Sequence, residues 1–334
     1  MMVDQIEFIK NIFLALPFGT DVFNYLYLKY LYFLKRNQKT IVSYPFQIFQ
    51  IELTNHCPMK CIMCPRTYKM DRKLGFMSFE LYKKAIDEYI EVNPKAAKRN
   101  RIWLHHFGES LLHPNFEKFI EYANSKGMKP CISINPFLLT QKNIEKLLVS
   151  KPYLLYISLD GHDDESFYQI RGKKNAFEIS KNNLLSFLDQ KIKRKSAIIV
   201  HLSMINFKEN QESIHTMKKY WKTIRGIDKV FIKPFETFAG DVESINKYAK
   251  QNKNLSQESI CRFPWTSMSL AWDGTIVACC RDYNNILPLG NLNNQSLTEI
   301  WNGKAMQFLR KTFINNKNIL LCKKCELLHN PPKL

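Results

Sequence analysis

Six short apolar runs that alternate with amphipathic segments constrain the fold of this chain more than any other feature of its sequence. Helical spacing of apolar residues between the runs predicts helices, with approximate limits 78–92, 115–125, 140–149, 176–189 and 209–221. Strands that alternate with helices every ~25–35 residues are typical of parallel βα units. Periodicity alone does not distinguish an open sheet from a barrel. The predicted strands are Phe46–Leu53, Arg101–His106, Lys129–Ile134, Tyr153–Leu159, Ala197–Met204 and Lys229–Lys233.

The pattern changes after residue 238. Two β-like runs, Ser267–Trp272 and Thr275–Ala278, flank Asp273-Gly274, a dipeptide that favours a tight hairpin turn. A helix is predicted over about 297–312. We therefore divide the chain into an N-terminal helical extension (1–45), a βα domain (46–238) and a small hairpin-and-helix domain (239–334).

The net charge of +19 raises nucleic acid, an anionic membrane or an anionic substrate as partners. Lysine accounts for most of this charge, with 38 Lys against 11 Arg, whereas nucleic-acid readers favour the bidentate contacts of Arg. The lysines are spread along the chain, and an AT-rich coding sequence explains most of their excess. We expect no nucleic-acid partner, and an RNA-modifying protein stays an alternative.

The N-terminal extension contains an aromatic segment, residues 22–36, that ends in Lys35-Arg36. One interpretation is a helix lying on an anionic membrane surface. The other, which we favour because such helices are commoner, is an amphipathic helix packed on the βα domain. Asp4 and Glu7 stand where a secretory signal carries basic residues, and no uncharged run approaches the roughly 20 residues of a membrane span. We expect a cytoplasmic protein.

Nine cysteines, an odd number without a secretory signal, favour thiolates used as metal ligands in a reducing compartment. Cys57, Cys61 and Cys64 follow the first predicted strand, and three thiolates from one loop can bind three irons of a [4Fe–4S] cube. The fourth iron then stays open to a small molecule. A zinc site that includes His56, or a redox-active thiol pair, is the alternative. Zinc is disfavoured because no second ligand pair lies close in sequence.

A second set of cysteines lies near the C-terminus. Cys261, Cys279, Cys322 and Cys325 would saturate another [4Fe–4S] cluster, and zinc held by the same four thiolates is equally compatible with their spacing. Cys131 and Cys280 are left over. Spacing alone does not decide between the two metals.

The Cys-x3-Cys-x2-Cys motif after the first strand resembles the radical S-adenosylmethionine (SAM) superfamily. The resemblance covers residues 46–235 and implies a partial (β/α)6 barrel, an α/β fold, whose first cluster binds SAM through its open iron. It further implies that one electron from a flavodoxin- or ferredoxin-like donor cleaves SAM to a 5′-deoxyadenosyl radical. In this superfamily the radical abstracts hydrogen from an unactivated C–H bond.

Further segments match in the expected order. His106-Phe107-Gly108-Glu109 resembles the Gly-Gly-Glu element that holds the methionyl amine of SAM. Phe107 replaces the first glycine, so only Gly108 and Glu109 carry over. For Asn135, Ser158 and Arg171, which are named next, the alternative is a polar residue at a strand end that caps the following helix. The resemblance implies that Met63 packs beside adenine and that Asn135, Ser158 and Arg171 contact the ribose or carboxylate of SAM.

The C-terminal region resembles the SPASM/Twitch extension of the same superfamily. The matching elements are Cys-x17-Cys with Gly-x4-Cys, the segments Leu289–Leu292 and Leu297–Asn302, and a closing Cys-x2-Cys. The resemblance implies an auxiliary [4Fe–4S] cluster held by four cysteines. No cysteine follows Cys325, so we expect the shorter Twitch-like form with one auxiliary cluster. Its ligands would be Cys261, Cys279, Cys322 and Cys325.

The substrate is inferred from the resemblance. Relatives with one auxiliary cluster include dehydrogenases and epimerases of aminocyclitols and sugars, whereas peptide-modifying relatives often add an N-terminal winged helix and a second auxiliary cluster. The 45 residues before the first strand are too short for a winged helix. We therefore expect dehydrogenation or epimerisation of a small carbohydrate-like substrate. A peptide maturase is the alternative, and a non-catalytic metal-binding scaffold is a further one.

Cys280 is a candidate hydrogen-atom donor, because a free thiol near the substrate could quench a substrate radical as an epimerase requires. The alternative is a small buried residue without a chemical role.

Overall fold

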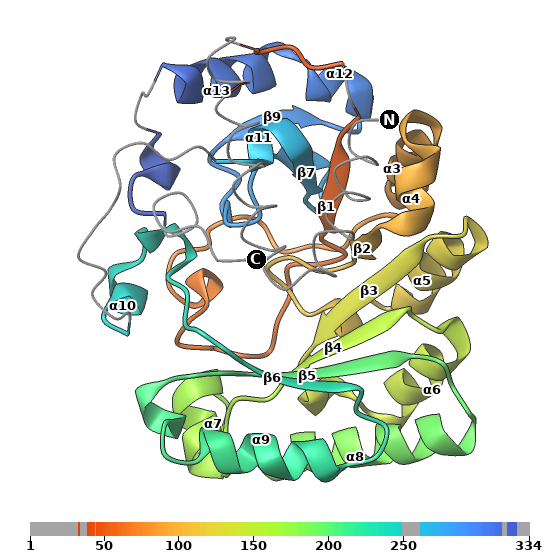
Figure 1. Cartoon of the computed structure of the whole chain (residues 1–334), viewed down its shortest axis with the longest axis vertical. Helices are drawn as coiled ribbons and strands as arrows, with labels where there is room; N and C mark the ends of the chain where they lie inside the picture. The colour runs from red at the N-terminus through yellow and green to blue at the C-terminus, as the bar shows by residue number, and fades with distance from the viewer. Residues whose placement is uncertain (1–32, 34–38, 44, 249–260, 316–318, 326–334) are drawn as a thin grey trace.

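The computed structural model describes residues 33, 39–43, 45–248, 261–315 and 319–325. A nine-stranded sheet with the order β6-β5-β4-β3-β2-β1-β7-β8-β9 organises these residues (Figure 1). β6 and β9 form its two edges, so the sheet is not closed. The strands are β1 (Gln47–Ile51), β2 (Arg101–Trp103), β3 (Lys129–Ile134), β4 (Leu154–Ser158), β5 (Ile199–Ile205), β6 (Lys229–Lys233), β7 (Ser267–Leu270), β8 (Thr275–Val277) and β9 (Pro288–Asn291).

The first six strands lie in chain order, and each pairs in parallel with the next. This arrangement confirms the predicted parallel βα units and the partial-barrel fold class. All six carboxyl ends therefore point to one edge of the sheet, where βα folds carry their binding loops. The helices of this part are α3 (Phe79–Val92), α4 (Pro94–Arg99), α5 (Phe116–Ser125), α6 (Gln141–Ser150), α7 (Asp164–Arg171), α8 (Phe177–Lys193) and α9 (Ile214–Thr223).

Side-chain caps begin several of these helices. Ser78 accepts a hydrogen bond from the amide of Leu81 at the start of α3, and Thr140 does the same at α6. Helix α7 was not predicted from the sequence. It begins with a reciprocal capping box between Asp163 and Ser166 and ends at Gly172, whose φ of 68° is left-handed.

The C-terminal hairpin continues the same sheet. β7 pairs in parallel with β1, β8 pairs antiparallel with β7, and β9 pairs antiparallel with β8. Gly274 has φ of 91°, as the predicted Asp273-Gly274 turn requires. β9 was not predicted as a strand. The short helices α10 (Glu243–Asn246) and α11 (Phe263–Thr266) precede the hairpin in the chain.

The single helix predicted over 297–312 is wrong. The structure has two helices, α12 (Leu297–Trp301) and α13 (Lys304–Ile314), separated at Asn302-Gly303 (Figure 1). The side chain of Asn302 accepts a hydrogen bond from the amide of Val42 at 3.1 Å and donates one to its carbonyl at 2.9 Å. This contact with a distant segment holds Asn302 outside the helix.

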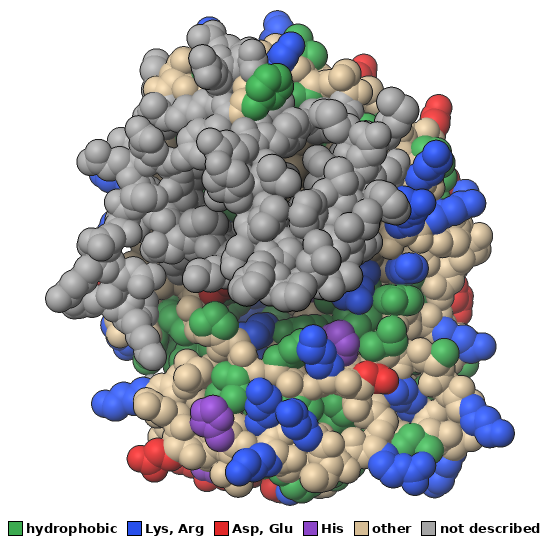
Figure 2. Space-filling model, in the orientation of Figure 1, with side chains coloured by type: hydrophobic (Ala, Val, Ile, Leu, Met, Phe, Trp, Pro, Cys, Tyr) green, Lys and Arg blue, Asp and Glu red, His purple; other side chains and the backbone are tan. Residues whose placement is uncertain are grey.

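Basic side chains are distributed over several parts of the visible face rather than gathered in one place (Figure 2). This distribution agrees with the spread of lysine along the sequence. In the described part of the chain, no helix combines the length and apolarity needed to cross a membrane. The segment 22–36, considered above as a membrane-surface helix, lies outside the described residues except for Phe33.

Candidate functional site

The first cysteine motif forms a loop after β1 that packs against the end of α7. The amide of Lys60 donates to the carbonyl of Arg171 at 3.1 Å, and that of Ile62 donates to Ile170 at 3.0 Å. These two bonds fix the loop that carries Cys57, Cys61 and Cys64. Met63 is buried between the last two cysteines and packs in a cluster with Ile170 and Phe207.

Burial makes these thiols poor acids. It raises the pKa of Cys64 to about 12 and also raises the pKa values of Cys57 and Cys61. The carboxylate of Glu109 raises the pKa of Cys57 further. A cation bound at the loop would stabilise the thiolates, so the loop has the chemistry of a metal site.

Arg171 connects this loop to the neighbouring strand ends. Its Nη1 lies 3.6 Å from the Sγ of Cys61, and its guanidinium forms an ion pair with Asp160, whose side chain is only 1% exposed. Asp160, which follows β4, also accepts a hydrogen bond at 2.6 Å from the amide of Ile205, the last residue of β5. Asp160 was not among the predicted site residues.

The Gly108-Glu109 pair lies against the same loop. The amide of Glu109 donates to the carbonyl of His56 at 2.8 Å, and its Oε2 accepts from the amide of Asn135 at 3.0 Å. Burial raises the pKa of Glu109 to about 8, partly opposed by Asn135 and Arg171. The structure therefore brings Glu109, Asn135 and Arg171 together. In the described residues no hydrogen bond joins Ser158, at the end of β4, to these three.

Three buried polar atoms around this point have no hydrogen-bond partner among the described residues. They are Oε1 of Glu109, Nδ2 of Asn135 and Nε of Arg171. Buried polar groups are rarely left unsatisfied, so such a group of donors and an acceptor suits a polar ligand with an amine and a carboxylate. The residues present therefore fit the methionyl end of SAM.

Phe107, which occupies the position of the first expected glycine, points into a separate apolar cluster. It packs with Val242, Ile245 and Tyr283. Its neighbour His106 uses Nε2 to donate to the carbonyl of Cys280 at 2.8 Å, which links the Gly108-Glu109 segment to the C-terminal cysteines.

A buried charge network that was not predicted from the sequence supports this link. Glu52 accepts two hydrogen bonds from Arg72, at 2.9 and 2.8 Å, and lies 3.9 Å from Nδ1 of His106. Glu52 is fully buried. The signal for it in the sequence was Glu52 itself, an acidic residue in a mostly apolar strand. A carboxylate buried there needs a partner of opposite charge, so a buried ion pair could have been predicted.

The two faces of the parallel sheet differ in how their side chains are covered. The face toward the helices is closed, and its side chains, such as Leu104 and Leu155, are fully buried. On the inner face several side chains along the strands are only half-buried, although Cys131, Leu154 and Ser203 of the same face are buried. We call this set the inner wall: Trp103, His105, Tyr156, His201, Phe231 and Lys233.

Aromatic contacts hold the inner wall together. Tyr156 stacks on Phe231 with ring centroids 5.9 Å apart and meets Trp103 edge-on at 6.1 Å. The Nζ of Lys233 lies 4.8 Å from the centre of the Tyr156 ring. Nδ1 of His105 and Oε1 of Gln50 are buried and have no partner among the described residues. The wall thus combines aromatic rings with unsatisfied polar atoms, as ligand sites commonly do.

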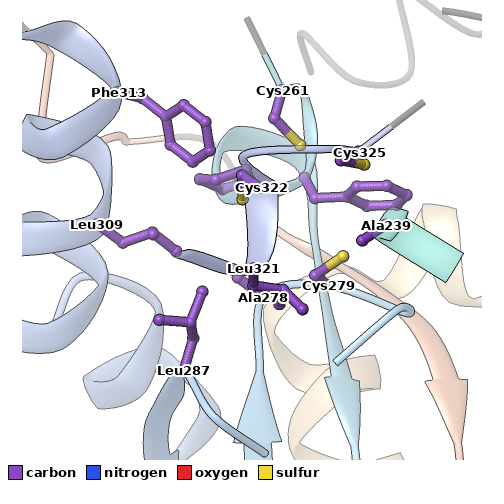
Figure 3. A pocket seen from close by; sticks show the side chains of 12 residues that line it. Ala239, Cys261, Ala278, Cys279, Leu287, Leu309, Phe313, Leu321, Cys322 and Cys325 are labelled. Carbon is purple, nitrogen blue, oxygen red and sulfur yellow. The ribbon is translucent and has the colours of Figure 1, made fainter. Parts of the chain in front are cut away.

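The C-terminal cysteines form the second site. Cys261, Cys279, Cys322 and Cys325 line one pocket, and Figure 3 shows their sulfurs turned toward the same space. Burial and the nearby thiols raise the pKa values of Cys261 and Cys322. The side chain of Cys280 does not line this pocket. The rest of the lining is apolar, including Ala278, Leu287, Leu309, Phe313 and Leu321 (Figure 3).

In the described part of the chain, no three His, Cys, Asp or Glu side chains approach closely enough to hold a single metal ion. The thiolates of a cubane bind different irons and stand farther apart than the ligands of one zinc ion.

Comparison with models of known protein families shows to which family the chain belongs. The model described as the radical SAM superfamily matches residues 51–220, about half of the chain. The chain belongs to the radical SAM superfamily. The model described as the SPASM iron–sulfur cluster-binding domain matches residues 261–326, which include all four C-terminal cysteines. Membership in the radical SAM superfamily implies SAM and a [4Fe–4S] cluster as cofactors, and the SPASM match implies an auxiliary iron–sulfur centre.

Two curated relatives illustrate the range of this superfamily. The chain is 23% identical over 286 residues to the antilisterial bacteriocin subtilosin biosynthesis protein AlbA of Bacillus subtilis, covering 77% of this chain and 60% of AlbA. It is 20% identical over 284 residues to the SAM-dependent 2-deoxy-scyllo-inosamine dehydrogenase of Niallia circulans, covering 84% and 92% of the two chains. The relatives therefore include a bacteriocin biosynthesis protein and a dehydrogenase of an aminocyclitol.

A solved radical SAM structure has the same fold. BtrN in complex with AdoMet and 2-DOIA superposes with a TM-score of 0.57 at 18% identity, covering 88% of this chain and 98% of BtrN. At this identity the similarity shows the fold alone.

Proposed function

We propose that this chain is a radical SAM oxidoreductase that removes hydrogen from a small, carbohydrate-like substrate held against the inner wall. The observation that carries the proposal is the contrast between the two faces of the sheet. The helical face is filled, whereas the inner face leaves aromatic and polar side chains half-buried. A small polar ring compound would satisfy His105 and Gln50 and pack on Tyr156 and its neighbours.

The residues around the carboxyl ends of the strands would hold the cofactors. Cys57, Cys61 and Cys64 would bind the first cluster, and the second would be bound by the C-terminal four. When bound, these groups supply a carbon radical strong enough to break an unactivated C–H bond. Gly108, Glu109, Asn135 and Arg171 would orient SAM between the cysteine loop and the inner wall.

The curated dehydrogenase that the chain matches over most of both lengths supports this substrate class. The similarity to AlbA, of which the chain spans 60%, supports the second candidate, maturation of a ribosomal peptide. The polar and aromatic inner wall favours a small ring over a peptide.

Anaerobic reconstitution with iron, sulfide, SAM and dithionite tests the proposal. We expect 5′-deoxyadenosine, and we expect aminocyclitols or sugar nucleotides to accelerate its formation. A substrate deuterated at the reacting carbon should transfer deuterium into 5′-deoxyadenosine. Absence of 5′-deoxyadenosine would refute the reaction class, and acceleration by peptides alone would favour the maturase.

A variant of the inner wall locates the substrate. Tyr156→Leu should abolish acceleration by the substrate while leaving slow, substrate-independent SAM cleavage. Tyr220→Leu is the matched control, because Tyr220 lies on α9 and is 44% exposed. Equal behaviour of the two variants would contradict the placement of the substrate.

A further inference from the structure

The charged residues of strands β2 to β6 all carry the same sign. These strands contain no Asp or Glu. Every Lys or Arg in them stands on the inner face, because its neighbour in the strand is apolar and belongs to the covered, helical face. Helices α8 and α9 cover that face at β5 and β6 (Figure 1). We call the four basic residues the strand cations: Arg101, Lys129, Lys229 and Lys233.

Strand register gathers three of the strand cations at one end of the inner wall. Arg101, Lys129 and Lys229 are the first residues of their strands, at the edge of the sheet opposite the cysteine loop. Arg101 pairs with Lys129, and Lys229 pairs with His201. Burial and then the charges of Arg101 and Lys229 lower the pKa of His201, so both cations lie near its ring. The three cations therefore form one group beside His201.

These three cations contact aromatic rings rather than carboxylates. The guanidinium of Arg101 lies 5.7 Å from the ring centre of Tyr153, and the Nζ of Lys129 lies 5.4 Å from the same point. The Nζ of Lys229 lies 5.0 Å from the ring centre of Phe231. A ring contact of this kind leaves the positive charge in place. In the described part of the chain, no strand cation forms an ion pair.

The acidic residue beside this group is engaged elsewhere. Asp228 directly precedes Lys229 in the chain. Its Oδ2 accepts a hydrogen bond from the amide of Val200 at 2.7 Å and lies 3.2 Å from the Nζ of Lys191. Lys191 belongs to α8, on the helical side of the sheet. Asp228 therefore holds α8 in place, and an anionic ligand on the inner face would supply the counter-charge that the three cations lack among the described residues.

The fourth strand cation extends the group along the inner wall. Lys233 ends β6, four residues after Lys229, which corresponds to ~13 Å of strand. It stands over the ring of Tyr156, toward the end of the sheet that carries the predicted SAM site. A sugar ring packed on Tyr156 would direct an attached phosphate or diphosphate toward the cations at the opposite end.

From this arrangement we infer that the substrate is a carbohydrate that carries a phosphate or diphosphate group, which Arg101, Lys129 and Lys229 bind. The inference rests on the proposed function and narrows its substrate class. Arginine and lysine are the side chains that bind phosphate oxygens most strongly, whereas the same cations would repel the amine of an aminocyclitol. A sugar phosphate and a nucleotide-linked sugar share this chemistry, and the experiment distinguishes them.

Binding of three glucose derivatives to the reconstituted full chain with SAM tests the inference. The probes are glucose 1-phosphate, UDP-glucose and the uncharged methyl glucoside, and calorimetry gives each dissociation constant. We expect at least one phosphorylated probe to bind about tenfold or more tightly than methyl glucoside, with an advantage that shrinks as salt rises. Tighter binding of glucose 1-phosphate would indicate a sugar phosphate, and tighter binding of UDP-glucose a nucleotide-linked sugar. Equal binding of all three would overturn the inference.

Substitutions among the strand cations locate the phosphate. The double variant Arg101→Gln, Lys229→Gln should bind the phosphorylated probe about tenfold or more weakly than the unmodified chain, with no change for methyl glucoside. Lys229→Arg keeps the charge and should keep the affinity. The matched control is Lys118→Gln, Lys142→Gln, because both lysines are exposed on outer helices. Equal weakening by the control would overturn the inference, because net charge alone would then explain binding.

SAM cleavage separates this inference from the proposed function. Phosphorylated sugars should accelerate the formation of 5′-deoxyadenosine, and neutral sugars and aminocyclitols should not. If neutral sugars or aminocyclitols accelerate it equally, the phosphate site is wrong and the proposed function stands. If an acidic peptide or an RNA oligonucleotide accelerates it and no carbohydrate does, the proposed function is wrong as well.

Discussion

The carbonyl oxygen of Thr54 occupies the space in which a side chain at Gly108 would begin. A Cβ built on Gly108 would lie 1.9 Å from that oxygen and 2.7 Å from the Cα of Asn55. Both neighbours are backbone atoms, which cannot rotate away. The glycine therefore lets the Glu109 segment lie directly on the loop that leads to the cysteines.

Gly108→Ala should consequently be strongly destabilising. We expect a loss of about 3 kcal/mol or more in the free energy of unfolding, since the backbone must move to admit the methyl group. Urea unfolding of the cluster-free chain measures it. Gly127→Ala is the control, because Gly127 has a left-handed φ of 72° but a Cβ there would meet only the flexible side chain of Lys98, at 4.0 Å, and the substitution should cost about 1 kcal/mol. Similar losses for the two variants would count against the contact with Thr54.

The ion pair between Asp160 and Arg171 yields a second prediction. Both side chains are enclosed, at 1% and 11% exposure, so Asp160→Ala leaves a charged guanidinium in a poorly hydrated place. We expect a loss of about 3–5 kcal/mol in the free energy of unfolding. Glu145→Ala is the comparison, because its pair with Arg194 is 45–48% exposed and should contribute less than about 1 kcal/mol. A loss below 1 kcal/mol for Asp160→Ala would indicate that water reaches the pair.

Local patterns carried most of what the sequence predicted correctly. The βα alternation and the Asp273-Gly274 turn each depend on residues close together in the chain. The structure also brings Glu109 and Asn135 into contact, two residues that the resemblance had proposed separately. Their roles toward SAM stay predictions.

The features that were missed depend on contacts between distant segments. Asn302 breaks the predicted C-terminal helix because it is bonded to Val42, which lies 260 residues earlier. The inner wall combines side chains from four strands, and no spacing within one strand reveals that its face stays open. Helix α7 was not predicted, although Asp163 is a good N-terminal cap.

His105 gives a prediction about pH. Burial, together with the charges of His106 and Lys233, lowers the pKa of His105 to about 3 in the folded chain, against about 6.5 when unfolded. The unfolded chain therefore takes up this proton first as the pH falls. The stabilising contribution is complete above pH 6.5 and is lost progressively between about 6.5 and 3.

His105→Gln should accordingly flatten the acid side of the stability profile. We expect the slope of unfolding free energy against pH, between pH 6 and 4.5, to fall by up to about 1.4 kcal/mol per unit. Urea unfolding at several pH values gives this slope. Part of the slope should remain, because the pKa values of His113 and His201 are also lowered. The exposed His215 on α9 supplies the control substitution, and an equal change there would contradict the assignment to His105.

The adjacent cysteines 279 and 280 should behave differently toward iron. Cys279 lines the second pocket with Cys261, Cys322 and Cys325, whereas the side chain of Cys280 does not. The reconstituted chain should hold about eight irons, and Cys279→Ala should lower this to about four, while Cys280→Ala keeps about eight. Iron and sulfide analysis with zinc measured in parallel checks this, and loss of iron in both variants would mean that the pocket does not define the ligands.

The Cys280 thiol stays the candidate hydrogen donor named from the sequence, and the carbonyl of Cys280 accepts a hydrogen bond from His106, beside the Gly108-Glu109 segment. If it donates, Cys280→Ala should still cleave SAM but should stop forming an epimerised product, and unchanged turnover and product would remove that role from Cys280.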